Sequence, residues 1–449
     1  MKQQELRAAT SLAGVFSVRL LGLFMIYPVF AAYAGHLTGT TPYLTGLALG
    51  IYGLTQGVLQ IPFGLLSDKV GRKTMIVLGL ILFAVGSAVA ALSTSIHGVI
   101  IGRALQGAGA VGSVILALVA DLTSEENRTK AMATVGITIG TSFMIALVAG
   151  PLIAGVVGVA GIFWLMVVLS AVGIGITLFV VPQPETLQVR RDAETVPAML
   201  GRVVTNPELL RLDFGIFALH AMLTASFLVV PSLLHDQLDV TSHSQWMVYL
   251  PVLLVSVAIM IPAIIVAEKY RRMKGVFVAA VVAMAASQVM LYAWQGSSFL
   301  VLLAITLFFT GFNVMEASLP SLITKVAPPE AKGTATGVYS SLQFLGIFVG
   351  GSVGGWVHQH AGHGSVFAWT GGLALLWVLV AATMKPPSYL TTKLVRLGAV
   401  ADAEQLVEKF KQLPGVADAV VYAEEKMAYL KVDSKVFDAE QASSLAGAG

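Results

Sequence analysis

Apolar stretches long enough to cross a lipid bilayer recur along the first 383 residues of the chain. A hydrocarbon core about 30 Å thick requires roughly 20 apolar residues per helix. Runs of that length, bounded by charges, Gly, Pro or short polar turns, occur twelve times. They predict an all-α membrane protein with helices over residues 12–34, 43–66, 74–93, 97–120, 131–157, 161–181, 211–234, 244–266, 274–294, 297–323, 334–357 and 363–383.

Longer polar segments divide the chain further. The interval 182–210 carries mixed charge and separates six helices from six. We expect an N-terminal six-helix half over residues 1–181, a cytoplasmic linker over 182–210 and a C-terminal six-helix half over 211–384. Residues 385–449 hold eight basic and nine acidic side chains and no long apolar run, so they predict a small water-soluble cytoplasmic domain.

Basic residues give the orientation in the membrane. Lys and Arg accumulate in the cytoplasmic loops of membrane proteins. Alternate loops hold all the loop lysines and arginines here, from Lys2 and Arg7 to Lys332, and the loops between them hold none. We therefore expect a multi-pass protein with both termini in the cytoplasm. The first apolar run is too long for a signal peptide, so we expect it to be retained as the first helix.

Composition excludes several classes of function. The chain is 56% hydrophobic and 11% charged, and its mean hydropathy is +0.83, which excludes a soluble enzyme. A net charge of +3 gives no basis for binding nucleic acid. The absence of cysteine excludes thiolate metal sites. The sequence contains no Gly-x-x-x-x-Gly-Lys-Ser/Thr loop, and this disfavours an ATP-driven pump. We expect no enzymatic activity, no cofactor and no resident metal.

The two halves show an internal repeat, which many transporters share. The turn after the second helix contains Pro62, Asp68, Lys69 and Arg72. Pro262, Glu268, Lys269 and Arg272 follow the eighth helix at a constant offset of 200. In the next pair of turns, Asp121 and Arg128 match Lys325 and Lys332 at an offset of 204. Two halves of common ancestry explain this repetition.

Three motifs resemble those of a known family. Gly64-x-x-x-Asp68-Lys69-x-Gly71-Arg72-Lys73 resembles the signature loop between helices 2 and 3 of the major facilitator superfamily. Gly102-Arg103-x-x-Gln106-Gly107-x-Gly109 resembles its second signature, in helix 4. Gly150-Pro151 resembles the helix 5 motif of its proton-coupled drug antiporters, although Ala146 replaces a glycine of that motif. The resemblance implies the major facilitator fold and a multi-pass protein of the bacterial inner membrane.

The signature loop predicts a conformational switch. Gly64 and Gly71 permit close helix packing and a tight turn. We expect Asp68, Arg72 and Asp121, with Lys73 beside them, to form a charge cluster that holds the helix pairs in one conformation and breaks in the other. The alternative is a simple excess of cytoplasmic positive charge with helix capping.

Ionisable groups inside the predicted helices are costly and are usually functional. Glu316 is our first candidate for a proton carrier because burial disfavours its charged form, and His220 and Asp213 follow. Each of them has the alternative of a structural role, as an interhelical hydrogen bond or an interfacial charge. The candidates for the lining of a central aqueous cavity are Arg19, Asn313, Thr310, Thr224 and Gln343. His358, His360 and His363 predict solvated loop side chains, with a divalent metal site as the weaker alternative.

The C-terminal segment predicts a βαββα order. Leu390–Leu397, Val416–Tyr422 and Met427–Val432 predict strands, and Asp402–Leu413 and Asp438–Leu445 predict helices. This order resembles the small ferredoxin-like modules of heavy-metal-binding domains. Those modules bind metal through Cys-x-x-Cys, which this chain lacks. A cytoplasmic ligand or partner for residues 385–449 and a folded appendage without a ligand are equally open.

The sequence thus predicts a secondary transporter that works by alternating access. The resemblance favours a proton-coupled antiporter that exports small organic or drug-like compounds, with a small-molecule substrate, protons and the lipid bilayer as its partners. The alternatives are a facilitated-diffusion carrier, an importer, or a membrane sensor that signals through the C-terminal domain.

Overall fold

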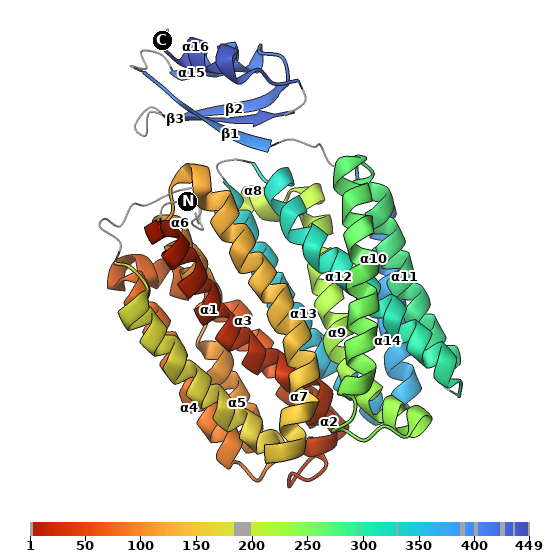
Figure 1. Ribbon diagram of the computed structural model, residues 1–449. Helices are drawn as coiled ribbons and strands as arrows, with labels where there is room; N and C mark the ends of the chain where they lie inside the picture. Colours follow the sequence, from red (N-terminus) through yellow and green to blue (C-terminus); the bar gives the residue numbers. More distant parts are fainter. Residues whose placement is uncertain are drawn as a thin grey trace.

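Long helices form an elongated bundle, and a small α/β domain covers one end of it (Figure 1). The computed structural model describes residues 3–183, 199–294, 296–328, 331–386, 391–398, 403–422, 427–433 and 436–447. The N-terminus lies at the same end of the bundle as the C-terminal domain. This end is called the domain side below.

The N-terminal half consists of the first seven helices of the chain. They are α1 (Gln3–Met25), α2 (Tyr27–Ala34), α3 (Pro42–Val70), α4 (Arg72–Leu92), α5 (Ile96–Ala108), α6 (Gly112–Asp121) and α7 (Glu125–Gly175), which a π-helical turn, Ile176–Val180, extends. Two predicted helices are interrupted, the first at Ile26 and the fourth at residues 109–111. In contrast, the fifth and sixth are joined in α7. Gly158 breaks α7 with φ 70° and ψ 174°, a conformation that favours glycine.

The C-terminal half contains a short helix and six long ones. They are α8 (Leu200–Val204), α9 (Pro207–Leu238), α10 (Trp246–Lys269), α11 (Met273–Ala293), α12 (Ser298–Val326), α13 (Lys332–Ala361) and α14 (His363–Ala382). The six long helices agree with the predicted spans to within four residues at each end. The N-terminal part of the predicted 182–210 linker falls largely outside the described residues, and the domain boundaries stay predictions.

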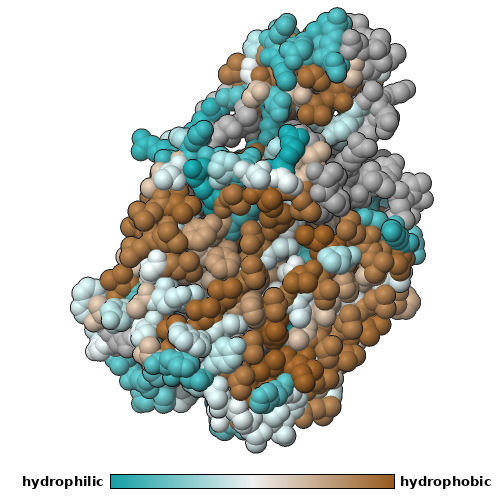
Figure 2. Space-filling view, turned by 180° about the vertical axis from the view of Figure 1, so that it is seen from behind, coloured by the Kyte–Doolittle hydropathy of each residue, from teal (hydrophilic) through white to brown (hydrophobic). Residues whose placement is uncertain are grey.

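Ten segments of the described chain are long and apolar enough to cross a membrane. One of them, Lys130–Val180, has 51 residues and contains the Gly158 break, so it supplies two spans. α13 is less apolar but packs between α3 and α9 inside the bundle. Apolar side chains cover the middle of the outer face, while polar side chains gather at its ends (Figure 2). These features confirm the predicted all-α membrane fold.

Glycines bring α3 and α13 into backbone contact across the two halves. A Cβ atom at Gly50 would lie 2.8 Å from the carbonyl oxygen of Phe348, and one at Gly355 would lie 2.8 Å from that of Pro42. A Cβ at Gly57 would approach the Ser341 carbonyl to 3.1 Å. Larger residues would separate the helices, so this glycine seam fixes how the halves meet.

The C-terminal domain has the predicted βαββα order. It contains β1 (Thr391–Arg396), α15 (Ala403–Lys411), β2 (Val416–Tyr422), β3 (Met427–Val432) and α16 (Ala439–Gly447). The strands form an antiparallel sheet in the order β1-β3-β2. Phe410 of α15 and Leu430 of β3 are fully buried in a core of the domain's own. Leu390, the predicted start of the first strand, lies outside the described residues.

The domain contacts the C-terminal half through Asp433 and Lys431. Asp433 accepts two hydrogen bonds, at 2.7 and 3.1 Å, from Arg271, which lies in the turn between α10 and α11. Lys431 of β3 donates to the carbonyl oxygens of Lys325 and Ala327, at 3.1 and 2.6 Å. These carbonyls belong to the C-terminal end of α12, where a positive charge is favourable.

Candidate proton and substrate site

Two arginines lie inside the N-terminal half with their donors directed at neutral acceptors. Arg19 of α1 donates to the Tyr52 hydroxyl at 2.5 Å and to Gln56. Arg103 of α5 donates to the Ala48 carbonyl at 3.2 Å and to Gln106 Oε1 at 2.9 Å. Both guanidinium groups also lie over the Tyr52 ring, at 5.8 and 5.1 Å. The two positive charges are therefore fixed in place by hydrogen bonds and by one shared aromatic ring.

Acidic groups and a histidine occupy the corresponding interior of the C-terminal half. His220 of α9 lies 2.9 Å from the Gln343 amide nitrogen of α13 and 3.2 Å from the Ile216 carbonyl oxygen. Both contacts are satisfied when Nδ1–H donates to Ile216 and Nε2 accepts from the Gln343 amide. Glu316 Oε2 of α12 lies 3.8 Å from the same Nε2, which is too far for a hydrogen bond.

Several buried polar atoms of the C-terminal half have no hydrogen-bond partner among the described residues. They include Glu316 Oε2, both carboxylate oxygens of Asp213 and the Tyr339 hydroxyl. Asp213 is 1% exposed, while the Glu316 side chain is 25% exposed. Tyr339 lies close enough to both carboxyl groups to interact with them electrostatically. Unpaired buried carboxyl groups are costly and are common at functional sites.

The sequence analysis named Asp213, His220, Glu316 and Gln343 as candidates but missed Tyr339. Its place one helical turn from Gln343 on α13 was the available signal, because residues four apart share a helix face. Tyrosines in apolar helices are common, however, and the pairing of α13 with α9 is not visible in the sequence. We call Asp213, His220, Glu316, Tyr339 and Gln343 the C-half polar cluster.

Aromatic rings fill the space between the halves beside this cluster. Phe143 of α7 packs against Phe24 at 4.9 Å and against Phe312 at 5.2 Å between ring centroids. Tyr27 packs against Phe227 at 5.4 Å, and its hydroxyl lies 3.3 Å from that of Thr224. These rings form a plug that joins α1, α2 and α7 to α9 and α12.

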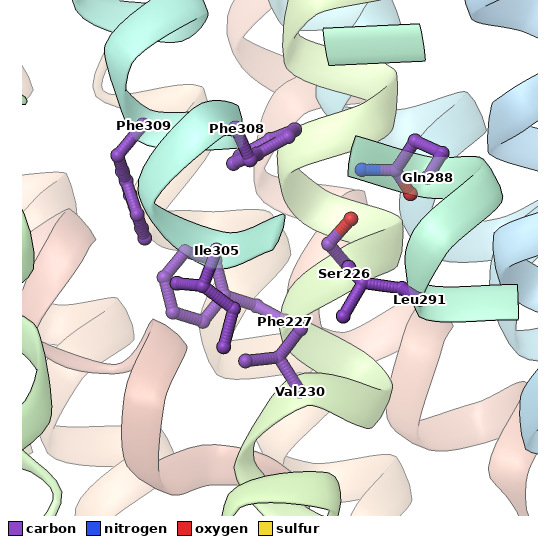
Figure 3. Close-up of a pocket in the computed structure, with 8 residues that line it drawn as sticks. All are labelled: Ser226, Phe227, Val230, Gln288, Leu291, Ile305, Phe308 and Phe309. Carbon is purple, nitrogen blue, oxygen red and sulfur yellow. The ribbon is translucent and has the colours of Figure 1, made fainter. Parts of the chain in front are cut away.

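Several of the residues predicted to line an aqueous cavity are buried. Thr224 and Asn313 are buried in protein, and the half-buried Thr310 donates to the Thr306 carbonyl at 2.7 Å. An apolar cavity of about 20 Å³ does occur between α9, α11 and α12, with Ser226 and Gln288 among its lining residues (Figure 3).

The signature loop brings its charged residues together on the domain side. Arg72 pairs with Asp68, donates to Asp121 at 3.1 Å and donates to Ser67 at 2.6 Å. Lys73 instead donates to the Val181 carbonyl at 2.5 Å. Gly71 has a φ of 104°, which favours glycine. Gly64 lies close to α6, since a Cβ atom at this position would be 3.5 Å from the Ser113 hydroxyl oxygen.

Glycines of the other two motifs lie at close helix contacts. A Cβ at Gly107 would overlap the backbone of Tyr52 in α3, and one at Gly150 would overlap the backbone of Met25 in α1. Pro151 lies beside Gly150 within α7. Both motifs therefore contribute to close helix packing in the N-terminal half.

The corresponding turn of the C-terminal half has a different pattern of ion pairs. Lys325, which aligns with Asp121, pairs directly with Glu268 at 2.7 Å. The Arg72 site of the N-terminal half thus has one base between two acids, whereas this site has one base and one acid.

Comparison with known proteins agrees with the geometry. The chain matches the family described as Major Facilitator Superfamily over residues 12–266 and 212–413, and the family described as YajR YAM domain over residues 397–441. It is 44% identical over 446 residues to the inner membrane transport protein YajR of Escherichia coli K12, with 98% of each chain covered.

Two further proteins show the breadth of the similarity. The multidrug resistance protein MdtH of Aeromonas hydrophila is 26% identical over 361 residues, which cover 76% of this chain and 85% of that protein. The crystal structure of the human organic anion transporter MFSD10 (TETRAN) aligns with a TM-score of 0.63 at 18% identity, covering 85% of this chain and 100% of that one. The last likeness concerns the fold alone.

Proposed function

Because the chain belongs to the Major Facilitator Superfamily, a superfamily of membrane transporters, we propose that it exchanges protons for small organic compounds across a bacterial inner membrane. Both termini and the domain side would face the cytoplasm. The name of the similar YajR protein, an inner membrane transport protein, supports the location, and that of MdtH supports the substrate class. Alternating access between two six-helix halves provides the mechanism.

The observation that carries proton coupling is the Glu316 carboxyl group. Its Oε2 atom has no hydrogen-bond partner among the described residues and lies 3.8 Å from His220 Nε2. Protonation of His220 beside an ionised Glu316 creates an ion pair, whereas protonation of Glu316 removes its negative charge. A proton exchanged here therefore alters how α12 holds α9.

Asp213 and Tyr339 extend this site toward the domain side. Tyr339 lies one helical turn, about 6 Å, before Gln343, and Asp213 lies two turns, about 10 Å, before His220. Both residues therefore stand between the Glu316 level and the domain side. Tyr339 is near enough to both carboxyl groups for an electrostatic interaction, which supports including Asp213 and Tyr339 in the proposed proton site.

The aromatic plug supports the proposal of an amphipathic substrate. Phe24, Phe143 and Phe312 offer apolar ring surfaces, and Glu316 is the nearby acid. Rings attract apolar bodies and cations. An amphipathic compound, neutral or cationic, that displaces the rings fits this site, while the Asp68–Arg72–Asp121 cluster stabilises one of the two transport states.

Proteoliposomes with an internal pH-sensitive dye test the proposal. Lipophilic cations and neutral drugs are added to the wild-type protein, to Glu316→Gln and to the exposed control Glu404→Gln. Substrate-triggered proton movement is expected in the wild type and the control and is expected to be lost in Glu316→Gln.

Solute flux without proton movement in the wild type would contradict proton coupling and leave facilitated diffusion. Uptake of a compound in the same direction as the protons, driven by the proton gradient, would make the protein an importer. Folded protein that moves none of the compounds would favour a sensor that signals through the C-terminal domain.

A further inference from the structure

A cavity of about 190 Å³ lies beneath the C-terminal domain, outside the C-half polar cluster. Its walls come from three parts of the chain: the ends of α9 and α12, the connection after α14, and β3 of the domain. This volume is well above the roughly 15 Å³ that a single water molecule requires. The cavity is therefore large enough for a small ligand.

The lining of this cavity is positively charged. Its charged residues are Lys325, Lys385, Lys431 and Glu208, which gives three positive charges against one negative charge, or +2. The Glu208 charge is already matched by Arg211 at 2.6 Å, and the Lys325 charge by Glu268 at 2.7 Å. An anionic ligand would interact favourably with this net positive lining.

The rest of the lining is apolar and lies at the level of the helix ends. Leu212 belongs to the start of α9, and Leu322 and Val326 belong to the end of α12. Basic pockets at the ends of membrane helices suit the phosphate of a lipid headgroup, and lysine binds phosphate as a point charge. A phosphate group could contact the lysines while its organic substituent contacts the apolar residues.

We propose that the cavity beneath the C-terminal domain is a binding site for a phosphate-bearing anion. Lys385, which is exposed, and Lys431 supply its charge contacts. Lys431 also donates to the end of α12, so the bound anion is shared by the domain, the connection and the transporter body. Occupancy consequently stabilises the seating of the domain on the C-terminal half.

The first test uses the purified full-length protein in detergent. Its thermal unfolding midpoint is followed while inorganic phosphate replaces chloride at constant ionic strength. A saturable rise of several degrees is expected for the wild type, because a ligand that binds the folded state stabilises it. Lys385→Gln is expected to weaken apparent phosphate affinity by roughly three- to tenfold. The matched control Lys409→Gln, on the helical layer that faces away from the bundle (Figure 1), is expected to behave as the wild type.

A second arm distinguishes the source of the phosphate. The same proteins are compared in nanodiscs of phosphatidylcholine with and without phosphatidylglycerol. Stabilisation by phosphatidylglycerol alone, lost in Lys385→Gln, assigns the site to a lipid headgroup, and stabilisation by inorganic phosphate assigns it to a soluble phosphate. Absence of both effects, or effects equal in Lys385→Gln and wild type, overturns the proposal. Because Lys431→Gln also removes a contact of the domain, Val326→Phe, which fills the cavity, serves as the second variant and should weaken binding.

Discussion

The two six-helix halves place their buried charges in opposite ways. In the N-terminal half, Arg19 and Arg103 direct their donors at neutral oxygens and at the ring of Tyr52. In the C-terminal half, Asp213 and Glu316 retain carboxylate oxygens without a hydrogen-bond partner in the described chain. An arginine stays protonated in proteins, whereas a carboxyl group can gain or lose a proton. The comparison suggests that the first half supplies fixed charge and the second supplies exchangeable charge.

A second difference between the halves concerns the repeated turns. Arg72 joins two acids at a site where its side chain and that of Asp121 are each 4% exposed. Lys325 and Glu268 are 22% and 39% exposed. The repeated turn therefore holds a buried Arg72–Asp121 pair, joined by the 28% exposed Asp68, in one half and a more exposed ion pair in the other. This leaves Arg271 of the second turn to hold Asp433 of the C-terminal domain.

The largest effect on stability is expected from Arg103→Leu. It leaves Gln106 without its 2.9 Å partner and removes packing against Tyr52. A loss of about 2 to 4 kcal/mol in the free energy of unfolding is expected. Thermal unfolding in detergent measures it, with Glu316→Gln as the comparison from the other half. If Arg103→Leu were as stable as the wild type, the interpretation of Arg19 and Arg103 as fixed structural charges would be wrong.

Asp213→Asn separates function from stability in the C-terminal half. Proton-coupled transport is expected to fall by about tenfold, which corresponds to roughly 1.4 kcal/mol in the barrier, since the amide cannot carry the proton. The midpoint of unfolding should stay equal or rise, because a neutral amide replaces a buried carboxyl group. The measurement is dye-reported proton flux beside thermal unfolding of the same preparation. A marked loss of stability with normal flux would make Asp213 a structural residue.

The two repeated turns can be compared directly by paired substitution. Asp121→Asn is expected to cost about 1 to 2 kcal/mol, because Arg72 then keeps a buried charge with one acid removed. Glu268→Gln at the more exposed pair is expected to cost about 0.5 kcal/mol. Unfolding midpoints of the two single variants provide the test. Equal losses would show that burial does not distinguish the two turns.

The smallest effect is expected from Asp433→Asn. Its partner Arg271 is 35% exposed, so the lost contact is worth about 0.5 kcal/mol or less. The stability of the bundle should not change, but amide hydrogen exchange in β3 should become faster as the domain loosens. Unchanged exchange would indicate that Lys431 alone seats the domain on the bundle.

Sequence patterns predicted the membrane fold well, because apolar run length and loop charge depend on the bilayer more than on tertiary packing. The breaks at Ile26 and residues 109–111 were missed, since both occur inside continuous apolar runs. Gly158 joins two predicted helices because one left-handed residue turns the chain without a polar loop.

The site was harder to predict than the fold. Glu316 and His220 stand out because charge is rare inside apolar helices, and the structure places them 3.8 Å apart. Their distance depends on how α12 packs on α9, which no local pattern contains. Tyr339 was missed for the same reason, and their roles in transport stay predictions.

The glycine seam of α3 and α13 is built from backbone atoms that every sequence possesses. The nearest α13 atoms to Gly50 and Gly57 are the carbonyl oxygens of Phe348 and Ser341. Substitutions elsewhere can therefore accumulate without disturbing this joint. Under the proposed function, changes in the rings of the plug would alter which compounds bind while the glycine seam keeps the contact between the two halves unchanged.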